Sequence, residues 1–442
     1  MAYLKVLLLL VLAWVVNLAA PVLLSAIESL SGAESVIAQT LWCLGLFLGF
    51  GWLCSHAAEG TLFPNFTLQL LVGIVLHDAL SPLSSQLTLA VVVCTVLAAL
   101  ILKSGGDEID RREFASIAYP TFMIAVLGYL VTFMVTYVLL RWLGLDGSTS
   151  ALLAAILGST DPAALIPTLK RLTFKPDVRR VSDMAVAESA LNDAVGAIFT
   201  GAVAVMVAGG VELPDVQSLM GHLLSSSNLE LLGQQFLFGT LAGLLGWGGM
   251  YAFERYKHRH HAQGEAEPIH DFAIALGGPL MTFLLAQLIH GNGFLAAFIA
   301  GLMGNFNRGS RAFHTLIHSM EVKLESIAKP TIFMMVGPFV ALQDLVDTAG
   351  LGLLVSLLFM GIARPVAVLI SLGPTSIQWS EKFFLCAVRE TGVIPVVLAV
   401  MTVAQFPHLS LLMPLTAWVV IWTLTLLPAL TPWWARRLNI LE

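Results

Sequence analysis

Long apolar stretches follow one another along almost the whole chain, and short polar segments separate them. A helix of roughly 20 apolar residues is long enough to cross the core of a bilayer. The pattern predicts an all-α polytopic membrane protein with about 13–14 transmembrane helices. The expected spans lie near residues 4–26, 35–56, 64–81, 86–104, 114–143, 149–170, 183–209, 229–255, 269–290, 292–306, 327–343, 349–372, 381–404 and 409–430.

The composition agrees with a membrane protein, because 57% of the 442 residues are hydrophobic and only 11% are charged. A soluble domain carries about a quarter of charged residues. The net charge of −6 argues against a nucleic-acid partner. Cys43, Cys54, Cys94 and Cys386 lie in or beside apolar stretches and form no CxxC pair. These cysteines are expected to be packing residues, and no cofactor is expected.

The loops between the expected spans alternate in their content of Lys and Arg. The intervening loops, which hold no Lys or Arg, are 29–36, 209–228, 343–350 and 405–410. The positive-inside rule therefore predicts that both termini lie in the cytoplasm, in a prokaryotic-type inner or plasma membrane. The first apolar run could instead be a signal peptide, but its length and the position of Pro21 favour a retained helix.

Charged residues inside the expected spans are the first functional candidates. Each costs about 2.5–3.5 kcal/mol at the centre of a helix in lipid, so such residues need partners or water. The candidates are Asp161, Glu188, Asp193, Arg364, Arg389 and Glu390.

One expected span carries two carboxylates close together. Helical spacing places Ser189 and Asp193 on one face, and Glu188 and Asn192 on the neighbouring face. Arg364, a lone cation in a distant span, is the expected partner of Glu188, which leaves Asp193 available for an ion. A buried carboxylate holds either a proton or a cation, and alternating access to it makes an exchanger. The alternative is that Asp193 is a hydrogen-bonded packing acid.

Two expected spans contain residues that interrupt a helix. In the first, Pro162 removes a backbone donor and frees carbonyls beside Thr160 and Asp161. A capped helix start at a loop is the alternative there. The second interruption is Arg389-Glu390-Thr391-Gly392-Val393-Ile394-Pro395. Because transporters use broken helices in corresponding halves to bind ions, the matching positions predict two inverted repeats of about six helices.

These motifs together resemble those of the NhaP-type cation/proton antiporters, relatives of the eukaryotic sodium/proton exchangers. The resemblance covers roughly residues 35–430. It is carried by Thr160-Asp161-Pro162, Glu188-Ser189, Asn192-Asp193 and Arg364-Pro365.

The resemblance implies two crossing broken helices and a core domain that moves against a dimerisation domain in a homodimer. The implied divisions are 1–30 for an extra N-terminal helix, 35–81 and 229–306 for the dimerisation or interface domain with its linker helix, 86–209 and 327–430 for the ion-translocating core, and 431–442 for a short cytoplasmic tail.

The resemblance also implies roles for the site residues. Asp193 matches the acid that binds a cation or a proton in turn, and Ser189, Thr160 and Asp161 match the remainder of the cation/proton-binding site. The expected Na+ ligands are Asp193, Ser189 and Thr160. Glu188 and Arg364 match a structural ion pair. Asn192 stands where the electrogenic branch has an Asp, which implies electroneutral exchange of one cation for one proton.

Two departures from the family pattern concern the ion path. Ser104 stands where relatives often have a Glu, and Thr391 stands where relatives have an Arg, with Arg389 and Glu390 just before it. Ser104, Arg389 and Glu390 are therefore secondary site candidates.

The expected function is exchange of Na+ (or Li+) for H+ across the lipid bilayer by alternating access, not enzymatic catalysis. A K+/H+ or other monovalent cation/H+ antiporter of the same architecture is the alternative. An intramembrane enzyme is a remote alternative, because the second Asp in a Gly-x-Gly-Asp setting is absent from the sequence.

Overall fold

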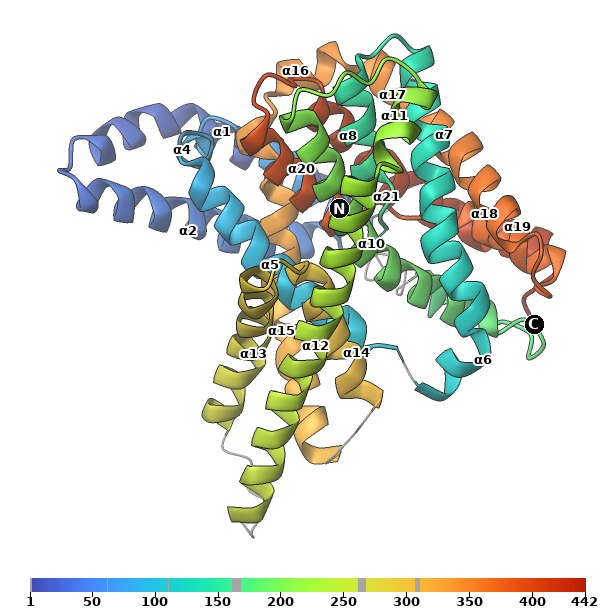
Figure 1. Cartoon of the computed structure of the whole chain (residues 1–442). Helices are drawn as coiled ribbons and strands as arrows, with labels where there is room; N and C mark the ends of the chain where they lie inside the picture. Colours follow the sequence, from blue (N-terminus) through green and yellow to red (C-terminus); the bar gives the residue numbers. More distant parts are fainter. Residues whose placement is uncertain (1, 62, 110, 161–167, 261–267, 307–310) are drawn as a thin grey trace.

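The computed structural model describes residues 2–61, 63–109, 111–160, 168–260, 268–306 and 311–442 (Figure 1). These residues are almost entirely helical and contain no strand apart from an isolated bridge between Phe174 and Leu441. The helices of the first half are α1 (Ala2–Glu28), α2 (Ala33–Ala58), α3 (Asn65–Val75), α4 (Ser81–Ser85), α5 (Leu87–Asp107), α6 (Arg111–Phe122), α7 (Tyr129–Trp142), α8 (Gly147–Leu157), α10 (Arg180–Ala208) and α11 (Val216–Leu223).

The second half of the chain continues the same pattern. Its helices are α12 (Ser226–His260), α13 (Pro268–Leu288), α14 (Gly293–Phe306), α15 (Arg311–Met334), α16 (Leu342–Asp347), α17 (Ala349–Leu358), α18 (Arg364–Leu372), α19 (Trp379–Ala387), α20 (Val393–Gln405) and α21 (Leu412–Arg437). Among the described residues, eight helices are long and apolar enough to cross a membrane, and five shorter helices are also apolar. The predicted all-α polytopic architecture is confirmed.

The order of elements in the first half recurs in the second half. A π-helical turn, Met123–Gly128, joins α6 to α7, and another, Phe359–Ala363, joins α17 to α18. Each of these bent helices is followed by an interrupted segment: α8 ends at Leu157, and α19 ends at Ala387 before α20 begins. π-turns and helix breaks often occur at functional positions. Their recurrence in the same order agrees with the expected repeats.

Three boundaries differ from those expected. The span predicted at 327–343 is α15, which begins at Arg311 and ends at Met334. Its charged residues obscured an amphipathic helix, since a hydropathy window averages both faces. The helix predicted at 64–81 is α3, which ends early at Val75, and a separate short helix, α4, begins at Ser81. Helix α21 continues to Arg437, so most of the predicted tail is helical, and Leu441 bridges to Phe174.

Helix α10 lies centrally and packs against helices on both sides of the molecule. In Figure 1, α12–α15 stand together on one side, and α6, α7, α18 and α19 stand on the other. Contacts from α10 reach α12 and α14 as well as α6 and α8. This position allows side chains on α10 to meet residues from both halves of the chain.

Helix α5 makes its closest packing with α14. A Cβ atom at Gly106 would overlap the backbone of Phe298 and Leu302, and one at Gly301 would overlap the backbone of Lys103. Glycine at both positions therefore permits the two backbones to touch. The sequence assigned α5 to the core and α14 to the interface domain, and that division stays a prediction.

Candidate functional site

The site is built on α10, in which small residues let the neighbouring elements approach closely. The side chains of Glu188, Ser189, Asn192 and Asp193 are all buried, with none more than 3% exposed. A Cβ atom on Gly196 would lie 3.0 Å from the Cβ of Ser159. The end of the interrupted segment thus lies directly against the face of α10 that carries the polar residues.

Thr160 connects the interrupted segment to α10 through three hydrogen bonds. Its backbone N–H donates to Oδ1 of Asn192 at 3.0 Å, and its hydroxyl lies 3.0 Å from the same oxygen. The hydroxyl also lies 2.8 Å from Oγ of Ser189. Since a hydroxyl carries one hydrogen, it can donate to only one of these two acceptors at a time. Two hydroxyl oxygens, those of Thr160 and Ser189, therefore lie side by side at the helix break.

Asn192 satisfies a backbone donor that the helix break leaves without a helical partner. Helix α8 ends at Leu157, and an exposed backbone group in lipid would be costly. The amide oxygen of Asn192 accepts from the Thr160 N–H and removes that cost. The sequence predicted Asn192 only as the residue that sets the charge of the site. Its contact with Thr160 depends on the tertiary arrangement and carried no local signal.

Asp193 lies one residue beyond Asn192 and one helical turn beyond Ser189, and it is 3% exposed. The described site therefore combines the buried carboxylate of Asp193 with the oxygen atoms of Ser189, Asn192 and Thr160. Oxygen donors at broken helices are the arrangement that transporters use for alkali cations. Asp161, which the sequence added to this site, lies outside the described residues.

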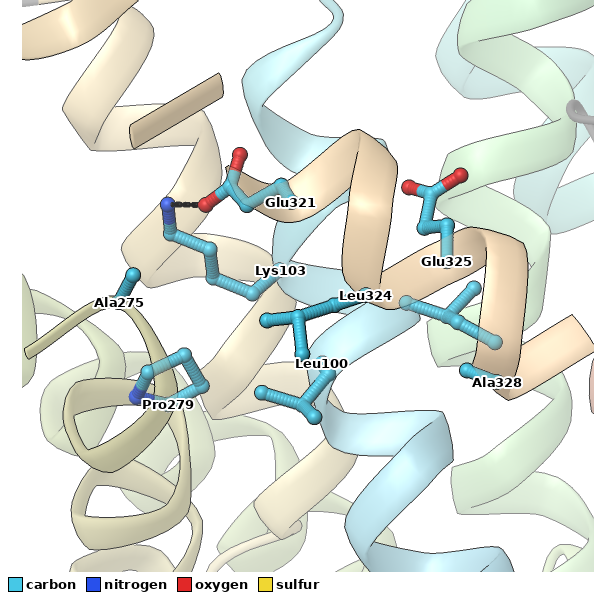
Figure 2. A pocket seen from close by; sticks show the side chains of 9 residues that line it. Leu100, Lys103, Ala275, Pro279, Glu321, Leu324, Glu325 and Ala328 are labelled. Atoms are coloured by element: carbon cyan, nitrogen blue, oxygen red, sulfur yellow. Dashed lines mark hydrogen bonds and ion pairs between the residues drawn. The ribbon is translucent and has the colours of Figure 1, made fainter. Parts of the chain in front are cut away.

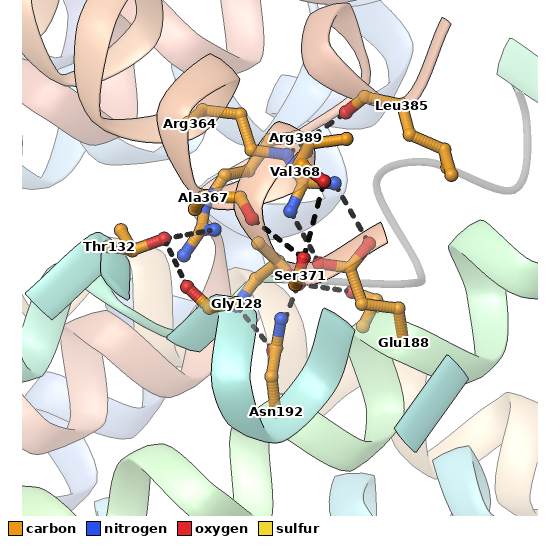
Figure 3. A network of polar contacts seen from close by, with 12 residues as sticks. Gly128, Thr132, Glu188, Asn192, Arg364, Ala367, Val368, Ser371, Leu385 and Arg389 are labelled. Carbon is orange, nitrogen blue, oxygen red and sulfur yellow. Dashed lines mark hydrogen bonds and ion pairs between the residues drawn. The ribbon is translucent and has the colours of Figure 1, made fainter. Parts of the chain in front are cut away.

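Glu188 and Arg364 form a buried, two-pronged ion pair. Nη1 of Arg364 lies 2.5 Å from one carboxylate oxygen of Glu188, and Nη2 lies 2.8 Å from the other (Figure 3). The same guanidinium donates to the carbonyl oxygens of Leu385 and Val388, at 3.0 Å and 3.3 Å. Arg364 therefore links α10 to the start of the second interruption, in addition to neutralising Glu188.

Arg389 extends from the second interruption to the end of α8. Its guanidinium donates to the carbonyl oxygens of Leu157 and Gly158 and lies 3.3 Å from the hydroxyl oxygen of Thr132. The carbonyl groups at a helix C-terminus carry partial negative charge and lack helical partners. Arg389 thus neutralises the end of α8 and connects the two interrupted segments. Figure 3 shows Arg389 beside Thr132 and Arg364.

Tyr129 is a site residue that the sequence reasoning missed. Its hydroxyl donates to the carbonyl oxygen of Ala155 at 2.8 Å, close to the atoms that Arg389 reaches. A Cβ atom at Gly158 would overlap the Tyr129 ring. A buried tyrosine needs a partner for its hydroxyl, and that requirement was the only sequence signal for this contact.

The other secondary candidates, Ser104 and Glu390, are both buried. Glu390 is buried beside Arg389, and the backbone N–H of Thr391 donates to the hydroxyl of Thr423 at 3.2 Å. Ser104 is buried on α5. The adjacent Gly105 faces α10, since a Cβ atom there would lie 3.8 Å from that of Ala190. The structure therefore brings Ser104 to the α5–α10 contact.

Comparison with known proteins assigns this arrangement to a family. The sequence profile described as "Sodium/hydrogen exchanger, transmembrane" matches residues 44–437. The chain belongs to the sodium/hydrogen exchanger family. As a member of this transmembrane family, it is an integral membrane protein. The polar residues of α10 and both interruptions lie within the matched range.

The proteins to which this chain is similar are named for different cations. The chain is 27% identical over 335 residues to the K(+)/H(+) antiporter NhaP2 of Shewanella sp. (strain MR-4). The aligned residues make up 75% of this chain and 55% of that protein. The chain thus spans about half the length of that relative. It is 26% identical over 378 residues to the Na(+)/H(+) antiporter 1 of Methanocaldococcus jannaschii, covering 81% of this chain and 82% of that one.

A solved structure shares the fold. The sodium proton antiporter MjNhaP1 from Methanocaldococcus jannaschii, determined at pH 8, aligns with a TM-score of 0.76 at 22% sequence identity. The alignment covers 91% of this chain and 99% of that chain. The long helices and their order are therefore those of a known membrane fold.

Proposed function

We propose that this protein exchanges a monovalent cation for a proton across the membrane, with Asp193 as the shared binding site. The observation that carries the proposal is the burial of Asp193 on α10, one turn from Ser189, where Thr160 joins the interrupted segment to the same helix. Family membership and relatives named as antiporters support the same function.

The mechanism follows from the charge on one carboxylate. When Asp193 is ionised, its negative charge and the oxygens of Ser189 and Thr160 bind the cation. When Asp193 holds a proton, that charge disappears and the cation leaves. Movement of the core past its neighbours then opens the site to the other side of the membrane, and each crossing carries one ion or the other.

The neighbouring ions keep this chemistry on Asp193. Glu188 is committed to Arg364 through two hydrogen bonds, and Arg389 is committed to the carbonyl groups at the end of α8. Both cations therefore already have hydrogen-bond partners of their own. The ion pairs hold the two interrupted segments against α10, so that the site moves as one unit.

Sodium, or lithium, is the proposed cation, and potassium is the alternative that the K(+)/H(+) antiporter relatives favour. In proteoliposomes with a pH-sensitive dye inside, Na+ and Li+ are expected to drive proton movement at lower concentrations than K+. Protein-free liposomes are the control. A response to K+ with none to Na+ or Li+ would establish the alternative and exclude the sodium proposal.

One-for-one exchange is expected to be electroneutral, because Asp193 titrates and the amide of Asn192 does not. The Na+-driven rate is therefore expected to stay unchanged when a membrane potential of either sign is imposed on the proteoliposomes. The measurement is the initial rate with and without that potential at equal ion gradients. Acceleration by one sign of potential would contradict one-for-one exchange while leaving antiport itself intact.

The assembly and orientation belong to the same proposal. The chain acts as a homodimer through the interface domain, with both termini in the cytoplasm, as the alternation of basic loops indicates. The partners are the lipid bilayer, monovalent cations and protons.

A further inference from the structure

A second group of buried charges lies away from Asp193, between α5 and α15. The ammonium group of Lys103 pairs with the carboxylate of Asp107. It also pairs with the carboxylate of Glu321 (Figure 2). The three side chains are at most 7% exposed. None of them belongs to the site on α10. Together they are called the Lys103 cluster below.

The Lys103 cluster has more acid than base. Two ionised carboxylates beside one ammonium leave a net negative charge in a buried place, which is unfavourable because water cannot solvate it. A proton on one carboxyl group removes the excess charge, since the cluster then contains one anion and one cation. The ion count alone therefore favours a protonated cluster.

Glu321 offers an oxygen for that proton. Its Oε1 atom pairs with Lys103, whereas its Oε2 atom is buried and lacks a hydrogen-bond partner among the described residues. Glu321 and Lys103 also line a small pocket with Glu325, and Ala275 and Pro279 of α13 lie on its other side (Figure 2). Glu321 therefore has a second carboxylate oxygen that can carry the proton while the first stays paired with Lys103.

Two further carboxylates lie near the cluster, and the charge of one of them, Glu108, acts on Asp107. Glu325 pairs with Lys329 one turn further along α15, and Glu108 follows Asp107 on α5. On α14, the residues that lie against Lys103 and Asp107 are Gly301 and Gly304, which carry no charge. The described residues of α3 and α20 include no charged side chain, and α2 carries Glu34 and His56.

The cluster joins α5, which the predicted division places in the moving core, to the part of α15 before residue 327, where that core resumes. Helix α5 meets α10 at Gly105 and Ala190, beside the site, and α15 packs against α20. A neutral cluster holds α5 and α15 together. Loss of the proton places two negative charges side by side and weakens that contact.

We infer that the Lys103 cluster is a second, proton-binding site, in which Glu321 takes up a proton and clamps α5 to α15, so that pH controls the movement of the core. The clamp is closed at acid pH and loosens as the pH rises. The regulatory part of this inference rests on the proposed antiport function, whereas proton binding by the cluster does not.

Thermal unfolding of the purified full chain in detergent tests proton binding without transport. Because folding favours the protonated cluster, the unfolding temperature of the wild type is expected to fall as the pH rises through the range in which the proton is lost. E321Q and D107N each leave one anion and one cation, so both are expected to lose that dependence. E230Q, on the exposed surface of α12, is expected to follow the wild type.

The outcomes of this titration separate a proton site from a structural ion pair. If E321Q and D107N shift the unfolding temperature by the same amount at every pH, parallel to the wild type, the proton site is overturned. If one variant does not fold, the other decides, since both make the same change in charge. Flat profiles for the variants beside a sloping wild type support the proton site.

Transport in proteoliposomes then tests the clamp. E321Q is expected to lose the rise in exchange rate that the wild type shows as the pH increases, because its cluster stays neutral and the clamp stays closed. An unchanged pH profile would overturn the clamp. If the wild type exchanges no cation, the proposed function fails instead, and the unfolding titration still decides whether the cluster binds a proton.

Discussion

Replacing Asp193 with Asn is expected to reduce cation-driven proton movement to the level of protein-free liposomes. The amide has nearly the same shape as the carboxylate but carries neither the charge that holds a cation nor a titratable proton. The measurement is the initial rate of dye response in proteoliposomes with equal amounts of protein. D347N, on the exposed helix α16, makes the same chemical change far from α10 and is expected to keep the wild-type rate.

The fold of D193N is expected to survive, since the substitution removes a buried charge without removing volume. Its unfolding temperature should equal or exceed that of the wild type. A D193N protein that folds and still exchanges ions at the wild-type rate would eliminate Asp193 as the shared site. In that case the packing role considered for this acid would be the correct one.

Replacing Glu188 with Gln is expected to destabilise the protein by about 3–5 kcal/mol, because it leaves the guanidinium of Arg364 buried without its anion. The effect should extend to the second interruption, where Arg364 also binds the carbonyls of Leu385 and Val388. The measurement is thermal unfolding in detergent, together with the yield of folded protein. E188Q is therefore expected to lose stability, whereas D193N loses transport.

A double variant separates the loss of the pair from the cost of an uncompensated charge. Replacing a buried ion pair with apolar side chains of similar volume is often neutral. E188L/R364M is therefore expected to be more stable than E188Q alone. If E188Q were as stable as the wild type while D193N unfolded, the roles assigned to the two acids would have to be exchanged.

Much of the fold could be predicted from sequence because lipid restricts the chain so strongly. Only helices satisfy their backbone groups within a bilayer, so long apolar runs translate almost directly into the observed elements. The contact between Glu188 and Arg364, 176 residues apart, could also be anticipated. Few charges occur inside the spans, and each requires a neutralising partner.

The remaining features depend on how the helices pack, and local patterns carry little information on packing. Arg389 was a candidate, but nothing in its neighbourhood indicated that it would reach the end of α8. The predicted start of α15, residue 327, lies beyond its observed start at Arg311. The reason is that Glu321 and Lys329 lower the mean hydropathy of the helix, although both side chains are buried in ion pairs. Nothing near Lys103 in the sequence indicated its pairing with Glu321, 218 residues further along the chain.

The most direct test of a site shared between a cation and a proton is proton release on cation binding to the purified protein. Calorimetric titration with Na+ in buffers of different ionisation enthalpy measures the number of protons released for each cation bound. The titration is done at a pH at which Asp193 is largely protonated. If Asp193 is the shared site, the wild type releases about one proton for each cation bound, and D193N shows neither binding nor release. Cation binding without proton release, or release that persists in D193N, would contradict the shared site.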